Sequence, residues 1–287
     1  TKSYLDGITW EHVDWGYSYK HVRSIQKRIF KSSSCDDQGK TRFLQKLLLR
    51  NPHAKLVAVH QVTTLNKGKK TPGVDKTVLT TDKEKMDLAR SLCLNGKATA
   101  VKRVWIPKPG KTEKRPLGIP TIRDRAKQAL AKLALEPEWE AKFEPNSYGF
   151  RPGRSTHDAV EAIFQHLHHG VDKYVFDADI RKCFDRIDHK ALIQKLNTFP
   201  LMERQITAWL RAEILDEYAQ TAKTSVPTAG TPQGGIISPL LANIALHGLE
   251  NHLVNMVTAR DFPKPHADAA RGKRAKAAAL GIVRYAD

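Results

Sequence analysis

The chain has 287 residues, of which 48 are Lys or Arg and 30 are Asp or Glu, so its formal net charge at pH 7 is +18. This excess favours nucleic acid as the partner and says little about the fold. No apolar run is long enough to span a bilayer, so no membrane partner is expected. The cysteines, Cys35, Cys93 and Cys183, are scattered and predict neither a disulfide framework nor a zinc site. We expect a reducing compartment, the cytoplasm of a bacterium or an organelle, since no targeting segment is seen.

Residues 20–66 carry apolar side chains at helical spacing, as in the stripe of Val22, Ile25 and Ile29, and predict packed helices. The segment 66–75, NKGKKTPGVD, breaks this pattern with Gly, Pro and Lys. It predicts an exposed basic loop.

Residues 101–120, VKRVWIPKPGKTEKRPLGIP, alternate β-branched and polar side chains around a KPGK turn. This pattern predicts a β-hairpin. A helix is expected from about Asp124 to Leu135, and Pro137 is expected to begin another short helix.

Residues 146–155, NSYGFRPGRS, are rich in turn formers and contain Arg151 and Arg154. Both arginines are candidate nucleic-acid contacts, although arginines in tight turns often bond backbone carbonyls. Ser155 or Thr156 is expected to cap a helix that ends at Gly170. The side chains expected on the buried face of this helix are Ala159, Val160, Ile163, Phe164 and Leu167.

The segment 173–180, KYVFDADI, predicts a strand. Asp188 is expected to cap a helix that runs to about Phe199, and another helix is expected over 203–218.

Residues 228–235, TAGTPQGG, predict a glycine-rich loop, and Ser238 with Pro239 is expected to start a helix to about Met256. Residues 281–287, GIVRYAD, predict a strand that runs into a turn. Because a domain rarely ends within a hairpin, we expect the natural chain to continue.

Four acids lie close together in VFDADIRKCFDRIDH, residues 175–189. In a strand Asp177 and Asp179 would point to the same face, with Asp179 at the rim. Metal-assisted phosphoryl transfer requires carboxylates from separate elements around two divalent ions about 3.5–4 Å apart. The second carboxylate would be Asp287 and the ions magnesium, which prefers oxygen ligands. Taken singly, each aspartate is more often a strand-end or turn residue.

Three blocks in order resemble reverse transcriptases: VFDADIRKCFDRIDH, TPQGGIISPLLANIAL and RYAD. The likeness is strongest to the multifunctional proteins encoded within group II introns, and it extends upstream through VWIPKPGKTEKRPLGIP and AVHQVTTLNKGKKTPGVD. It covers nearly the whole chain from about residue 10.

The resemblance implies the site residues. Asp179 and Asp287 would be catalytic and would hold the metal together with the backbone carbonyl of Ile180. A departure from the family pattern follows Asp287, where a second aspartate is expected. The fragment by itself would therefore be inactive as a polymerase.

The resemblance also implies a nucleotide-binding set. Lys108 and Arg115 would grip the triphosphate, Lys as a point charge and Arg as a planar fork. Phe184 would exclude a 2′-hydroxyl by its bulk, and the backbone amide of Cys183 would lie near the triphosphate. The remaining members, which would pack against the nascent base pair and template, are Gln233 and Gly234. Further candidates for nucleic-acid binding are Lys67, Lys69 and Lys70.

The function implied is that of a group II intron RNA-directed DNA polymerase, using two magnesium ions and deoxynucleoside triphosphates. Its partners would be group II intron RNA, an RNA template with a DNA primer, and target DNA. One alternative is a maturase that only binds RNA to assist splicing. Another is the reverse transcriptase of a retron or other retroelement.

The fold expected is α+β, with the fingers and palm of a right-hand polymerase, a ferredoxin-like palm sheet with packed helices, and no thumb in this sequence. Basic fingers with the N-terminal extension would occupy 1–145. The palm would occupy 146–287, incomplete at its C-terminus, with 190–230 near the junction of fingers and palm.

Overall fold

The structure is a computed structural model that describes residues 4–107, 110, 112–168, 174–216, 223–259 and 280–286. The chain divides into two compact units. Unit 1 comprises Thr1–Lys142 and Lys182–Leu241, and unit 2 comprises Phe143–Arg181 and Ala242–Asp287. The assignment of 1–145 to fingers and 146–287 to palm stays a prediction. No helix among the described residues is long and apolar enough to cross a bilayer.

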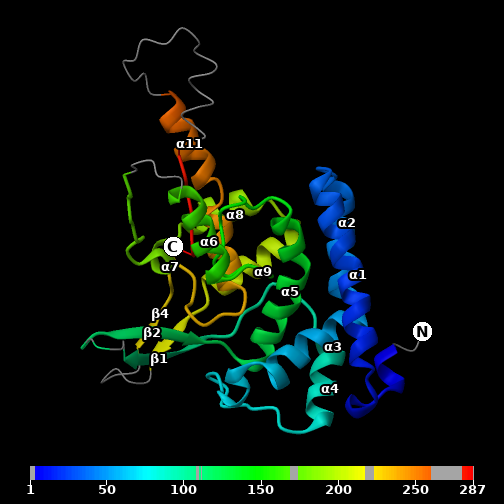
Figure 1. Cartoon of the computed structure of the whole chain (residues 1–287). Helices are drawn as coiled ribbons and strands as arrows, with labels where there is room; N and C mark the ends of the chain where they lie inside the picture. Colours follow the sequence, from blue (N-terminus) through cyan, green and yellow to red (C-terminus); the bar gives the residue numbers. More distant parts are fainter. Residues whose placement is uncertain are drawn as a thin grey trace, which may run out of the picture. The chain divides into compact units, whose positions relative to one another are not determined.

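The helices predicted over 20–66 are confirmed in unit 1, where α1 (Trp15–Ser34), α2 (Gln38–Arg50) and α3 (Pro52–His60) follow one another. Figure 1 shows α1 and α2 side by side. Each begins at a side chain that accepts a backbone N–H bond, as N-caps do. The caps are Asp14, Asp37 and Asn51. Short turns flank these helices: η1 (Tyr4–Gly7), η2 (Trp10–His12), η3 (Gln61–Leu65) and η4 (Lys67–Lys70), with α4 (Asp82–Ser91) after them.

The central helix of unit 1 is α5, which runs unbroken over Ile122–Glu140 and contacts α1, α2 and α3. The prediction of a break at Pro137 was therefore wrong. Proline removes the N–H that would bond the carbonyl of Leu133. The Gln26 side-chain amide of α1 donates to that carbonyl at 3.0 Å instead. A tertiary contact thus compensates for the proline, and the helix continues.

The predicted hairpin is confirmed as β1 (Val101–Pro107) and β2 (Lys114–Ile119), which pair antiparallel with Trp105 opposite Pro116. It belongs to a four-stranded sheet of order β2-β1-β3-β4, where β3 is Ile214–Asp216 and β4 is Lys223–Ser225. The helix predicted over 203–218 was too long. It is α9 (Pro200–Leu210), and residues 214–216 form β3 because they pair in parallel with β1.

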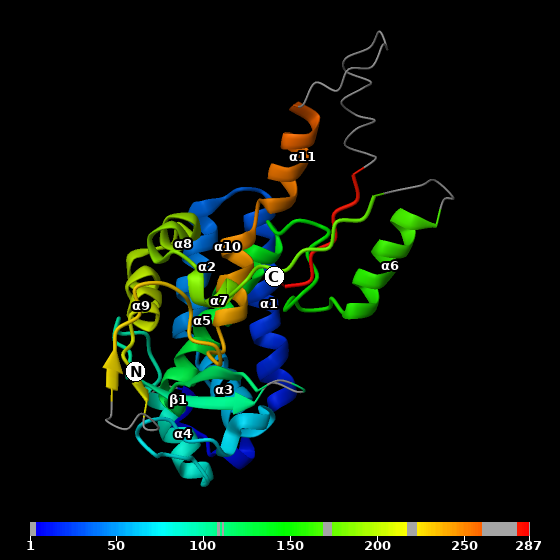
Figure 2. The same ribbon diagram turned by 90° about the vertical axis from the view of Figure 1, so that its left-hand side faces the viewer.

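Besides α9, the described residues after 182 form four helices. In unit 1, α7 (Cys183–Arg186) precedes α8 (His189–Leu196), which Asp188 caps as predicted. Figure 2 shows α8 next to α9. The single helix predicted after Ser238 is two helices, α10 (Ser238–Leu246) and α11 (Leu249–Ala259). They are separated at Gly248, whose φ of 95° does not fit a right-handed helix.

Unit 2 contains the two strands that the sequence predicted wrongly. Residues 174–180 are extended but belong to no strand, and within 280–286 only Arg284 forms a bridge, parallel to Ser147. An extended segment becomes a strand only when a neighbour pairs with its backbone groups. No such neighbour flanks 174–180 within the residues described here.

The helix predicted after residue 155 is confirmed as α6 (Thr156–Leu167), which begins with a capping box of Ser155 and Asp158. Its predicted burial was wrong. Ala159 is buried, but the larger side chains are 44–63% exposed, namely Val160, Ile163, Phe164 and Leu167. The capping box forms the helix locally, whereas burial requires a packed neighbour.

We predict that Gln26→Leu lowers the free energy of unfolding by about 1–2 kcal/mol, because the Leu133 carbonyl loses its donor. In a Pro137→Ala background the restored backbone N–H replaces that donor, so the same change should cost less than half as much. Urea unfolding of the four variants measures this coupling. Gln194→Leu on α8, an exposed glutamine, is the control and should shift stability by no more than about 0.5 kcal/mol. Equal costs in both backgrounds would contradict the assignment.

Candidate nucleotide-binding and metal site

Three segments predicted to bind nucleotide meet within unit 1. The loop of residues 230–235 lies between α7 and β2, and backbone bonds hold it on both sides. Thr231 N donates to the Phe184 carbonyl at 2.7 Å, and Gly118 N donates to the Gln233 carbonyl at 2.6 Å. The chain thus brings Phe184, Gln233 and the strand that carries Arg115 together.

Two glycines make this close approach possible. A Cβ at Gly230 would lie 2.8 Å from the backbone carbonyl groups of Phe184 and Asp185, and a Cβ at Gly234 would lie 2.5 Å from the carbonyl oxygen of Gly118. Both glycines also have positive φ, 86° and 118°. No other residue fits such positions without strain. At both glycines the close approach is to protein backbone.

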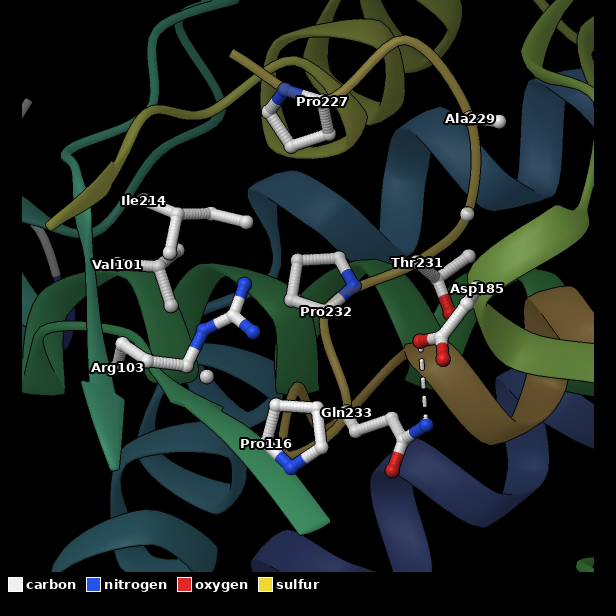
Figure 3. A pocket seen from close by; sticks show the side chains of 12 residues that line it. Val101, Arg103, Pro116, Asp185, Ile214, Pro227, Ala229, Thr231, Pro232 and Gln233 are labelled. Atoms are coloured by element: carbon white, nitrogen blue, oxygen red, sulfur yellow. Dashed lines mark hydrogen bonds between the residues drawn. The ribbon is translucent and has the colours of Figure 1, made fainter. Parts of the chain in front are cut away.

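A cavity of about 250 Å³ lies beside this loop, between it and the faces of β1 and β2. Figure 3 shows Arg103, Pro116 and Pro232 on its wall, with Asp185 and Gln233 joined by a hydrogen bond. In that bond Gln233 Nε2 donates to Asp185 Oδ1 at 3.3 Å. The side-chain amide of a predicted nucleotide-binding residue is therefore oriented by a neighbouring carboxylate.

The other predicted nucleotide-binding residues have different surroundings. Arg115 is exposed on β2, opposite Ile106, and Lys108 lies outside the described residues. The Cys183 side chain is buried. The prediction concerns its backbone amide and not the thiol. Phe184 is half-buried.

The four clustered acids take separate roles. Asp188 caps α8 by accepting from Ala191 N at 2.6 Å, and Asp185 lines the cavity. Asp177 and Asp179 are exposed in the extended segment 174–180.

Of the predicted metal ligands, Asp287 lies outside the described residues. Asp179 and Ile180 are exposed, and no hydrogen bond or ion pair engages the Asp179 carboxylate in the described part of the chain. In that part, no group of three or more His, Cys, Asp or Glu side chains could hold a metal ion. A free carboxylate together with a carbonyl is an oxygen donor set of the kind magnesium takes.

The two arginines of 146–155 differ in exposure. Arg151 is buried, and its guanidinium donates to the carbonyls of Glu144 at 2.9 Å and Ser147 at 2.7 Å. This is the alternative that the sequence left open, so the placement gives no support to a nucleic-acid contact at Arg151. Arg154 is exposed over the ring of Tyr148, and its Nη1 also donates to a backbone carbonyl, that of Pro145, at 3.0 Å.

The basic segment at 67–70 forms η4 and exposes all three lysines: Lys67, Lys69 and Lys70. It is tied to α5 by Arg125, which donates to the carbonyls of Gly68 and Thr71. Burial lowers the pKa of the Arg125 guanidinium, and Asp75 opposes that shift. An anchored helical turn thus presents the lysines to solvent, as a phosphate-binding role requires.

Sequence reasoning missed Arg103, Thr231 and Asp185 as cavity residues. The alternation of side chains along the predicted hairpin places Arg103 on the face opposite to Arg115. The sequence therefore already indicated that Arg103 belongs to a different surface from Arg115. Nothing in the sequence, however, indicated that the loop would cover that face.

Comparison with known families supports the same blocks. The family model described as reverse transcriptase (RNA-dependent DNA polymerase) matches residues 106–287, and a model of the N-terminal domain of reverse transcriptase matches residues 10–92. The solved structure of a partial Cas6-RT-Cas1--Cas2 complex covers 77% of this chain and 36% of its own at 25% identity, with a TM-score of 0.45.

Among curated relatives, the group II intron-encoded protein LtrA of Lactococcus lactis subsp. cremoris is 37% identical over 253 residues, 86% of this chain and 41% of the relative. Protein YkfC of Escherichia coli is 30% identical over 241 residues, which is 81% of this chain and 62% of the relative. The chain therefore spans between about two fifths and three fifths of these relatives. Because the first family model covers more than half of the sequence, the chain belongs to the reverse transcriptase (RNA-dependent DNA polymerase) family.

Proposed function

We propose that this chain is the nucleotide-binding and catalytic core of an RNA-directed DNA polymerase encoded by a group II intron. The reaction is attack of a primer 3′-hydroxyl on the α-phosphate of a deoxynucleoside triphosphate, with release of pyrophosphate. The observation that carries the proposal is the meeting of β2, α7 and the 230–235 loop in unit 1. These are the segments that contain Arg115, Phe184 and Gln233, and they lie within the part that matches the polymerase family model.

Asp179 and Asp287, with the carbonyl of Ile180, would hold two magnesium ions. The Asp179 carboxylate is exposed and has no hydrogen-bond or ion-pair partner among the described residues, which supports this assignment. When bound, the ions would neutralise charge that develops on the reacting phosphate.

The chain's own side chains position the nucleotide. Arg115 and Lys108 neutralise the triphosphate, and exposure of Arg115 leaves its fork free for two parallel bonds to phosphate oxygens. The half-buried Phe184 fills the space that a 2′-hydroxyl would need, which selects deoxynucleotides by steric clash. The bond from Gln233 to Asp185 holds the Gln233 side chain at the base pair being formed.

Intron RNA is the proposed second partner, because LtrA is by its name a group II intron-encoded protein. The net charge of +18 suits a large RNA, and the exposed lysines of η4 are candidate phosphate contacts. A maturase without polymerase activity is the alternative favoured by the relative named Maturase-like protein 1 of Euglena gracilis, 31% identical over 195 residues. Such a protein would not need Asp179 or Phe184.

We predict that Asp179→Ala in the naturally encoded protein reduces cDNA synthesis by at least about 1,000-fold, since a metal ligand is lost. Affinity for intron RNA should stay within about twofold, because phosphate and shape contacts dominate that binding. Primer extension and filter binding measure the two effects. Asp87→Ala, an exposed acid on α4, removes the same charge and should leave synthesis intact. Undiminished synthesis by Asp179→Ala would remove Asp179 from the site.

Phe184→Ala is expected to raise the use of ribonucleotides relative to deoxynucleotides by about 10- to 100-fold, because the clash with the 2′-hydroxyl disappears. Competition between the two nucleotides in primer extension measures the ratio. Phe164→Ala on α6, an exposed aromatic, should leave the ratio unchanged. If Phe184→Ala keeps full discrimination while its thermal stability falls, the ring is only a packing residue.

A further inference from the structure

The turn that leads to Asp287 contains a residue in an unfavourable backbone conformation. Ala286 has a φ of 70°, in the left-handed region, where the Cβ of a side chain crowds a neighbouring carbonyl oxygen. A residue other than glycine keeps such a φ only where its surroundings enforce it, and such positions cluster at functional sites. The carbonyl of Ala286 belongs to the peptide bond that joins it to Asp287, the proposed metal ligand. Whatever holds this carbonyl therefore sets the direction in which the chain continues to Asp287.

The Arg284 side chain is the group that holds this carbonyl. Its Nη1 donates to the Ala286 carbonyl oxygen at 2.8 Å and to Asn243 Oδ1 at 3.2 Å, and its Nη2 donates to Ser147 Oγ at 2.6 Å. The backbone N–H of Arg284 also donates, to the Asn146 carbonyl at 2.9 Å. All of these residues belong to unit 2. Because the guanidinium donors have a fixed planar geometry, bonds to separate segments hold the turn in one orientation.

The acceptors that orient Arg284 are firmly packed. Ser147 and Asn243 are each only 1% exposed, and the Asn243 amide donates to the Gly149 carbonyl at 2.8 Å. Gly149 also packs directly against the turn, because a Cβ at this position would lie 2.7 Å from the Cα of Ala286. The half-buried Arg284 side chain therefore connects buried residues of unit 2 to the turn.

The charge of Arg284 has the opposite effect from its hydrogen bonds. Arg284 stands three residues before a predicted metal ligand, and a positive charge there repels a divalent cation and weakens its binding. If charge were the only effect, removal of Arg284 would strengthen metal binding. Loss of the bond to the Ala286 carbonyl would instead release the turn and weaken metal binding. Because the two effects have opposite signs, a binding measurement can separate them.

We propose that Arg284 is a positioning residue for the metal site, which holds the turn of residues 284–286 in the conformation that presents Asp287. It acts through the Ala286 carbonyl, while Ser147 and Asn243 keep the guanidinium in place. Groups that orient a metal ligand in this way typically change metal affinity by about 10- to 100-fold when they are removed. The inference rests on the proposed function, because it takes Asp287 as a metal ligand.

The test measures metal binding by the naturally encoded protein without nucleotide or primer. Mn²⁺ is the probe, since it takes the same oxygen ligands as magnesium, and electron paramagnetic resonance of free Mn²⁺ gives the dissociation constant. Asp179→Ala shows which part of the binding belongs to the site. Arg284→Gln should weaken this binding at least about tenfold, because the turn is released. Arg284→Lys keeps the charge but loses the planar fork, so it should weaken binding to a similar degree.

Arg28→Gln on α1 is the control for charge, because it removes an exposed arginine whose charge is screened by salt. It should leave the dissociation constant within about twofold of the wild-type value. Thermal unfolding of each variant shows whether it is folded.

Two further measurements do not depend on the folding of Arg284→Gln. Ser147→Ala removes one bond and leaves Arg284 in place, so Mn²⁺ binding should weaken by about threefold. In Arg284→Ala, guanidinium chloride at a concentration that leaves the wild type folded should restore binding. Ammonium chloride at the same concentration supplies the charge without the fork and should restore none.

Unchanged or stronger Mn²⁺ binding by folded Arg284→Gln overturns the inference, because only the charge would then matter. Wild-type binding by Arg284→Lys, or rescue by ammonium as well as guanidinium, overturns it for the same reason. If Asp179→Ala removes the Mn²⁺ binding but Arg284→Gln does not weaken it, the inference fails and the proposed function stands. A wild type whose Mn²⁺ binding does not depend on Asp179 overturns the proposed metal site, and this inference with it.

Discussion

The contact between the 230–235 loop and its two neighbours is the constraint on which the proposed nucleotide site depends. Backbone bonds from Thr231 to Phe184 and from Gly118 to Gln233 fix the loop against α7 and β2. They form only because Gly230 and Gly234 have no Cβ to collide with the facing carbonyls. Backbone bonds do not depend on the rotamers of long side chains, so they can fix the position of Gln233 whatever the surrounding side chains do.

The support for this arrangement comes from α5 and the helices around it. Residues on all sides of α5 are buried, so the helix acts as the core of unit 1. Gln128 of α5 accepts from Ile236 N at 2.8 Å, directly after the loop. The core helix is thereby linked to the loop that lines the site, and loop positioning follows from core packing. A site on a rigid scaffold can keep the geometry that phosphoryl transfer requires.

The two faces of the hairpin carry different side chains because residues alternate along each strand. One face carries Arg115, which the proposed function assigns to the triphosphate, and the other carries Arg103 and Trp105 over a cavity. Neighbouring residues of a two-stranded ribbon point to opposite sides, so its two faces have different chemistry. The acids of 175–189 also differ, since Asp188 caps a helix, Asp185 accepts from Gln233, and Asp179 has no hydrogen-bond partner in the part of the chain that the structure describes.

The sequence by itself determined whatever depends on neighbours along the chain. The caps at Ser155 and Asp188 and the β1–β2 hairpin follow from local hydrogen bonds and short-range pairing. The ordered blocks identified the family for a related reason, because the chemistry of the site restricts which residues can stand there. Tertiary structure decided the continuous α5, where Gln26 replaces the donor that Pro137 lacks, and the pairing of β3 with β1. It also decided that 174–180 stays unpaired, since strands and cavities are made by residues far apart in sequence, whose meeting no local pattern records.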